Sequence, residues 1–216
     1  MGPKTKVALL NGLSNDAVVT DADDGNCGGK TWAAGSTITW AVRGGLPPSL
    51  PRAALEAAAA AQLAKWAAAT GLVFEKASEE PMVTISFADQ SRANDLLFDG
   101  PGGKLAHATP SAVVFDKSEY WELDGRGRGV APRVLEGVSR PCPRRYPHPR
   151  RKAYGCSEED FWDPFFAFEP VLLHEIGHVL GLGHSDAPAD VMAPFYNKSK
   201  RELTAGDAAA AKALIA

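Results

Sequence analysis

Short runs of apolar and β-branched residues predict strands at three places in the first half of the chain. Residues 36–42 alternate and are rich in β-branched side chains, as is typical of a strand. Residues 83–87 and 112–115 are two further predicted strands. Between the last two segments, a glycine-rich loop that starts at Phe98 runs into a short strand ending at Ala108. The first half therefore contains the strands of a sheet.

Helical periodicity predicts a long helix between the first two strands. Residues 52–69 consist largely of alanine, and their bulky apolar residues, Leu55, Leu63 and Trp66, fall on one helical face. Gly71 follows where such a helix should end. We interpret this face as the core-facing stripe of a surface helix.

Two further helices are predicted near the end of the chain. Residues 168–180 have a helical pattern, and Pro170 suits the first turn. Residues 204–207 resemble a capping box, which predicts a last helix from Ala208 to Ile215. The order of strand, helix, strands and two helices favours one α/β domain with a mixed sheet.

Length and composition narrow the class of protein. A chain of 216 residues that is 45% hydrophobic is long enough to bury the core of one domain, which we place at 31–216 after an extended polar lead-in at 1–30. The net charge of −3 argues against a dedicated nucleic-acid binder. No run of about 18 apolar residues predicts a membrane span, and residues 7–10 are too short an apolar run for a signal peptide.

Residues 122–164 differ in character and predict an inserted basic loop. The stretch 125–152 carries nine basic residues against Glu136 alone, together with many glycines and prolines. Since the loop enters before the predicted helix at 168–180, it should lie near that helix. Its charge could attract acidic substrates or polymers, or the loop could simply be solvated.

The three cysteines contain no CxxC pair, which argues against a thiolate zinc site. Cys142 and Cys156 flank a proline- and arginine-rich stretch of the basic loop. We favour a disulfide between them, formed in an oxidising compartment, over two unpaired thiols. Cys27 is then left over as a free thiol, a reading we favour over a thiolate that caps a metal.

The strongest chemical signal is a cluster of three histidines and a glutamate within eleven residues. On a helix, His174 and His178 share a face and can present two imidazoles to one metal. Catalytic zinc usually keeps three protein ligands and a water, and Glu175 is placed to take a proton from that water. Gly181 can end the helix, so that the chain turns and His184 supplies the third ligand. The alternative, surface histidines that bind nothing, explains this full pattern less well.

This segment resembles the metzincin zinc peptidases, whose HExxHxxGxxH motif precedes a turn that contains a methionine, matched here by Met192. Within that group the chain is most similar to the matrixin branch, the catalytic domain of matrix metalloproteinase-like enzymes. Further matching motifs occur at 98–108, 115–121, 184–185 and 192–196. The resemblance implies a twisted, mainly parallel sheet, a long active-site helix, a C-terminal helix and a methionine floor beneath one catalytic zinc.

The resemblance also implies a substrate cleft with an S1′ pocket. Its residues would be Leu105, Ala106, Pro170, Pro194, Phe195 and Tyr196. The first two would form an edge strand whose backbone pairs with an extended peptide. The last three would form one wall, and the proline at 170 lies where the family lines the pocket.

Matrixins usually carry a second, structural zinc held by three histidines and an aspartate. Only His107 matches those ligands, because Arg92, Asn94 and Val114 stand at the other positions. One imidazole cannot hold a structural zinc, so we predict that this second zinc is absent and that His107 is partly buried or solvated.

The structural calcium of the family is better matched. Its carboxylates would be Asp99, Asp116 and Glu119, and its backbone carbonyls those of Gly100, Gly102 and Lys104. Oxygen ligands on a bendable loop suit a hard cation, although a tight turn beside solvated acids is the alternative.

These observations favour a zinc-dependent endopeptidase that hydrolyses internal peptide bonds of protein substrates. Zinc-bound water would attack the carbonyl, and Glu175 would pass its proton to the leaving nitrogen. A peptide-binding module with a zinc site but no turnover is the second hypothesis, and a zinc hydrolase for other substrates is the third. By resemblance, we expect a secreted, monomeric protein.

Overall fold

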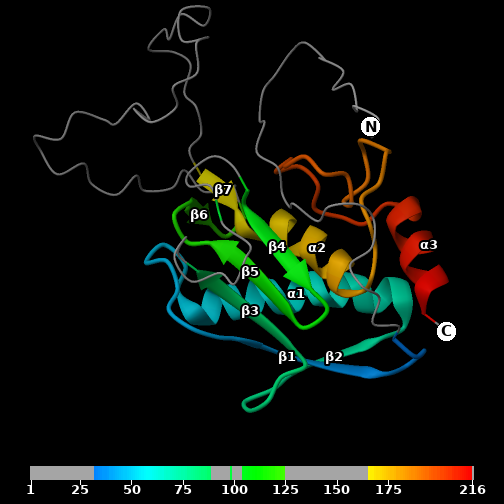
Figure 1. The fold of residues 1–216 in the computed structure, drawn as a ribbon, viewed down its shortest axis with the longest axis horizontal. Helices are drawn as coiled ribbons and strands as arrows, with labels where there is room; N and C mark the ends of the chain where they lie inside the picture. Colours follow the sequence, from blue (N-terminus) through cyan, green and yellow to red (C-terminus); the bar gives the residue numbers. More distant parts are fainter. Residues whose placement is uncertain (1–31, 89–97, 99–103, 125–164, 216) are drawn as a thin grey trace, which may run out of the picture.

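The computed structural model describes residues 32–88, 98, 104–124 and 165–215 (Figure 1). In chain order, its elements are β1 (Thr37–Val42), α1 (Arg52–Thr70), β2 (Val73–Lys76), β3 (Val83–Ala88), β4 (Ala106–Thr109), β5 (Ala112–Asp116), β6 (Tyr120–Glu122), β7 (Phe165–Ala167), α2 (Phe168–Val179) and α3 (Ala205–Leu214). None of the helices among these residues combines the length and the apolar character that a membrane span needs.

The main sheet has five strands in the order β2-β1-β3-β5-β4. All neighbours are parallel except β4, which runs antiparallel to β5 at the edge of the sheet. Strands β6 and β7 form a separate parallel pair that leads directly into α2. The predicted mixed, mainly parallel sheet is therefore confirmed.

Helices α1 and α2 cover one face of the sheet, behind the strands in Figure 1. Strand β3 shows why: every second residue is buried, namely Val83, Ile85 and Phe87. Helix α1 packs against α2 through Trp66, which is fully buried and donates its indole N–H to the Leu173 carbonyl at 2.8 Å. The segment that begins the histidine motif thus lies on a buried helix.

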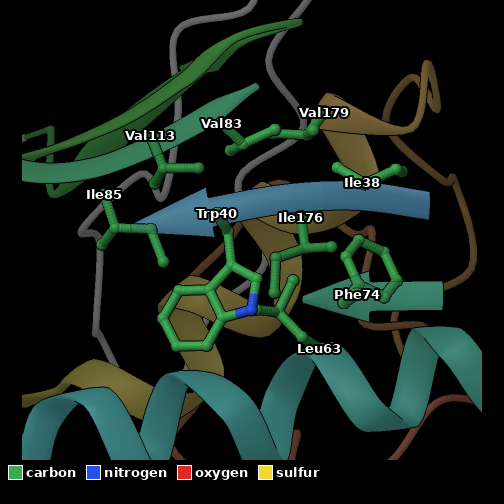
Figure 2. A pocket seen from close by; sticks show the side chains of 9 residues that line it. All are labelled: Ile38, Trp40, Leu63, Phe74, Val83, Ile85, Val113, Ile176 and Val179. Carbon is green, nitrogen blue, oxygen red and sulfur yellow. The ribbon is translucent and has the colours of Figure 1, made fainter. Parts of the chain in front are cut away.

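A small apolar cavity of about 10 Å³ remains between the sheet and these helices (Figure 2). It is lined by Ile38, Trp40, Leu63, Phe74, Val83, Ile85, Val113, Ile176 and Val179. A buried water needs two to four polar partners, which this lining does not offer. The cavity is therefore a packing defect of the core and no ligand site.

The predicted helices are present, with one correction. Helix α1 ends at Thr70, followed by Gly71 in the left-handed conformation, and α2 begins at Phe168. The last helix begins at Ala205 and not at Ala208, because Thr204 is the N-cap and the residues of the predicted capping box already form the first turn.

Three strands were not predicted: β2, β6 and β7. Glu122, the first residue of the predicted basic loop at 122–164, belongs to β6, and β6 and β7 on either side of that segment pair with each other. The lead-in at 1–30, the basic stretch from 125 to 164 and all three cysteines lie outside the described residues, as does the predicted disulfide between Cys142 and Cys156.

Candidate metal centre

Helix α2 presents the first two histidines of the motif on one face. His174 and His178 are 2% and 1% exposed, and their Nε2 atoms lie 3.0 Å apart. The helix ends at Val179, and Gly181 has a φ of 100°, a left-handed conformation that favours glycine. The chain turns at this glycine, as predicted, and continues toward His184.

Both helical histidines are oriented by backbone carbonyls. The Nδ1 of His174 lies 2.7 Å from the Val191 carbonyl oxygen, and the Nδ1 of His178 lies 2.7 Å from that of Leu182. A carbonyl only accepts hydrogen bonds, so each Nδ1 must carry the proton. Both Nε2 atoms then point lone pairs at each other, an arrangement that a cation between them stabilises.

His184 completes the cluster from beyond the turn. The ligand atoms of the three histidines all lie within 4.8 Å of one another. The Nε2 of His184 is buried and has no hydrogen-bond partner among the described residues. Three converging imidazole rings fit the donor set of a catalytic zinc site.

Burial favours the uncharged form of each histidine, as metal coordination requires. It holds the pKa of His174 well below the usual range, lowers the pKa of His178 to about 4 and lowers the pKa of His184. The mutual repulsion of the rings adds to this for His174. The cluster is therefore ready to bind a metal without first losing protons at neutral pH.

Glu175 also has the properties expected of a residue at a catalytic zinc site. Its side chain is fully buried, and neither carboxylate oxygen has a hydrogen-bond partner among the described residues. Burial raises the pKa of Glu175 well above its usual value. An uncompensated buried carboxylate is costly, which points to a role beside a cation or a reacting group.

Met192 packs against α2 at Gly177. A Cβ atom at Gly177 would lie 2.2 Å from the Sδ of Met192 and 3.2 Å from Cζ2 of Trp66. Met192 itself is 2% exposed. The glycine therefore lets the methionine approach the helix that carries His174 and His178.

The predicted rim of the cleft coincides with the edge strand. Ala106 opens β4, and Leu105 precedes it; both side chains are fully buried. The Leu105 carbonyl accepts the N–H of Asp116, so this segment is held against β5. The side chains belong to the core, and only the backbone of β4 can offer an edge to a peptide.

The predicted wall divides into exposed and buried parts. Phe195 is 61% exposed, whereas Tyr196 is 6% exposed and its hydroxyl accepts the N–H of Ala167 at 2.9 Å. Pro194 is half-buried, and Pro170 is buried in the first turn of α2. Phe195 is thus the member of the set that offers an apolar side chain to solvent.

The predicted calcium ligands are described only in part. Asp116 is fully buried and accepts hydrogen bonds from the backbone N–H and the hydroxyl of Ser118, both at 2.7 Å. Glu119 is 6% exposed, and Lys104 lies just before the edge strand. The other expected ligands, Asp99, Gly100 and Gly102, lie outside the described residues.

His107 lies in β4 opposite Val114 and is 8% exposed. Its ring stacks on Phe98 with the centroids 4.8 Å apart. Burial, and then the nearby Lys104, lower its pKa. Of the two predicted alternatives, a partly buried or a solvated His107, the structure shows the side chain buried. Arg92 and Asn94 lie outside the described residues.

Comparison with known proteins identifies the family. The model of the family Matrixin matches residues 31–216. The chain belongs to the matrixin family. It is 31% identical over 183 residues to mouse matrix metalloproteinase-25, covering 78% of this chain and 23% of that protein.

Two smaller relatives agree with this membership. Soybean metalloendoproteinase 1 is 30% identical over 169 residues, which is 76% of this chain and 45% of that protein. Rat matrilysin is 31% identical over 160 residues, which is 71% of this chain and 46% of that protein. The chain thus spans half or less of the length of these relatives. The matrixin membership supports a metalloendopeptidase, and the histidine cluster is compatible with a catalytic zinc.

Several residues of the centre were missed by sequence reasoning. Gly177 had a signal, because a glycine inside a helix often marks close packing. The carbonyls of Val191 and Leu182 had no signal in the sequence, since every residue has a backbone carbonyl and the residue type does not show which one accepts a hydrogen bond. Asp207 was recognised as part of a capping box, but its bonds to Val191 and Met192 were not foreseen.

Proposed function

We propose that this matrixin is a zinc-dependent endopeptidase that hydrolyses internal peptide bonds of protein substrates. The observation that carries the proposal is the convergence of three neutral imidazoles beside a buried carboxylate without a hydrogen-bond partner. His174, His178 and His184 would hold the zinc. When bound, zinc supplies a Lewis acid for the scissile carbonyl and acidifies the attacking water.

Other residues near the proposed zinc would transfer the proton and bind the substrate. Glu175 would take the proton of the attacking water and deliver it to the leaving nitrogen. The backbone of β4 at Leu105 and Ala106 pairs with an extended substrate. Pro170, Pro194, Phe195 and Tyr196 shape the S1′ side, where Phe195 contributes the exposed contact.

A structural calcium and an extracellular location belong to the same proposal. Asp116 and Glu119, which match carboxylate ligands of the family's calcium, are both buried, and carboxylate oxygens suit a hard cation. Thermal melting of chelated protein with and without added calcium tests this site. An unchanged melting temperature on addition would remove calcium from the proposal. We place the protein outside the cell, as a monomer.

A quenched-peptide library tests the activity. Wild-type protein loaded with zinc should cleave, whereas Glu175→Gln, a shape-matched variant, and the chelated protein should not. Wild-type protein that cleaves no better than both controls would contradict the enzyme. If the same peptides still bind the zinc-loaded protein, the peptide-binding module takes its place.

A further inference from the structure

Two carboxylates connect α3 to the loop that carries the metal ligands. We propose that Asp207 and Asp190 are positioning residues of the metal centre, which hold the chain from His184 to Met192 in the geometry that zinc requires. We call these two side chains and their hydrogen bonds the carboxylate clamp. The inference rests on the zinc site of the proposed function and adds α3 to it.

Asp207 acts on the peptide group that orients the first ligand. It is 2% exposed, and its carboxylate accepts the N–H of Val191 at 2.9 Å and the N–H of Met192 at 3.1 Å. The Met192 N–H and the Val191 carbonyl belong to one planar peptide group. That carbonyl accepts the Nδ1–H of His174 at 2.7 Å. Asp207 thereby fixes the orientation of the peptide group that accepts the hydrogen bond of the His174 imidazole.

Asp190 acts on the other end of the loop. One of its oxygens accepts the hydroxyl of Ser185 at 2.6 Å, and the other accepts the hydroxyl of Thr204 at 2.6 Å. Ser185 directly follows His184, and its N–H donates to the Met192 carbonyl at 2.9 Å. The third ligand is therefore tied through its neighbour to the N-cap of α3 and to the methionine floor.

Helix capping alone does not explain these contacts. A capping box accounts for the bonds between Thr204 and Asp207, which satisfy the first turn of α3. The bonds from Asp207 to Val191 and Met192 satisfy no helix terminus. Gly206 adds to this, because a Cβ there would lie 3.1 Å from Asp190, so the glycine leaves room for the clamp.

Zinc affinity and ligand geometry test the clamp. Asp207→Asn and Asp190→Asn keep the side-chain shape but place an amide N–H₂ against groups that already donate. Ala211→Gly is the matched control, because it weakens the same helix at a buried residue outside the clamp. For each folded protein we would measure the zinc Kd by chelator competition, the d–d absorption after Co²⁺ substitution, and the melting temperature.

The clamp predicts a specific pattern of results. Outer-shell partners of metal ligands typically contribute about 10–100-fold to metal affinity, so Asp207→Asn should raise the zinc Kd by that factor and shift the Co²⁺ band. Asp190→Asn should raise the Kd toward the lower end of that range. Ala211→Gly should lower the melting temperature and leave both the Kd and the band unchanged.

Three results would overturn the inference. The first is that both asparagine variants have the same zinc Kd and the same Co²⁺ band as the wild type, which itself binds zinc. The proposed function would then survive. The second is a control that weakens zinc binding as much as the variants at equal thermal destabilisation. The third is a wild-type protein that binds no zinc, which removes the proposed function as well. If Asp207→Asn does not fold, the half-buried Asp190 decides the matter.

Discussion

Replacing Gly177 by alanine tests how tightly Met192 packs against the helix that carries the proposed zinc ligands His174 and His178. The new Cβ would lie 2.2 Å from the Sδ and 3.0 Å from the Cε of Met192, and 3.2 Å from Trp66. Alanine is favoured over glycine in a helix by about 1 kcal/mol, whereas overpacking a core costs about 1–3 kcal/mol. Since the sulfur contact is far inside van der Waals distance, we expect a net loss of about 1–2 kcal/mol.

A double-mutant cycle separates this clash from other effects of the substitution. Urea unfolding of metal-free protein would be followed for Gly177→Ala alone and in a Met192→Ala background. With the methionine removed, the loss should shrink or turn into a gain of at most about 1 kcal/mol, because the helical preference then opposes only the 3.2 Å contact with Trp66. An equal loss in both backgrounds would refute the packing account. If Gly177→Ala lowers zinc affinity only when Met192 is present, the packing account also applies to the metal centre.

Three further predictions follow from the described contacts. Burial lowers the pKa of His178 from 6.5 to about 4, so the unfolded chain binds more protons at this residue in that window. His178 should therefore account for a loss of roughly 3 kcal/mol of stability in metal-free protein as pH falls from 6.5 to 4, measured as the difference in urea unfolding between wild type and His178→Gln; the same pH dependence in both proteins would contradict it. Tyr196→Phe leaves the N–H of Ala167 without its acceptor and should cost about 1–3 kcal/mol in urea unfolding, with unchanged stability as the opposing result. Val113→Ile adds a methylene to the apolar cavity and should raise stability by about 0.8 kcal/mol; a lower melting temperature would show that the cavity cannot accept it.

The sequence predicted the elements whose signals are local. Short apolar and β-branched runs located β1, β3 and β5, and the alanine-rich stretch with Gly71 after it located α1. The histidine motif predicted both the ligand cluster and the turn at Gly181. Each of these depends on spacing within one short segment, which the residues themselves record.

Elements that depend on distant partners were harder to predict. Strand β2 is an edge strand whose residues are largely exposed, so no burial pattern marks it. Strands β6 and β7 are three residues long and pair across a gap of more than forty residues in the chain. The clamp depends in the same way on bonds between Asp207 and backbone groups of another segment, which residue identity cannot reveal.

The short spacing of the ligands has a consequence for the thermodynamics of the protein. All three histidines fall within eleven residues, so the entropic cost of closing a chelate loop is small even in the denatured ensemble. Unfolded chains should then retain measurable metal affinity. Bound metal would then stabilise the folded protein by less than its dissociation constant for the native state implies. The reason is that only the difference in metal binding between the folded and unfolded states contributes to stability. Metal could also join the chain before tertiary structure exists and act as a template for the turn at Gly181.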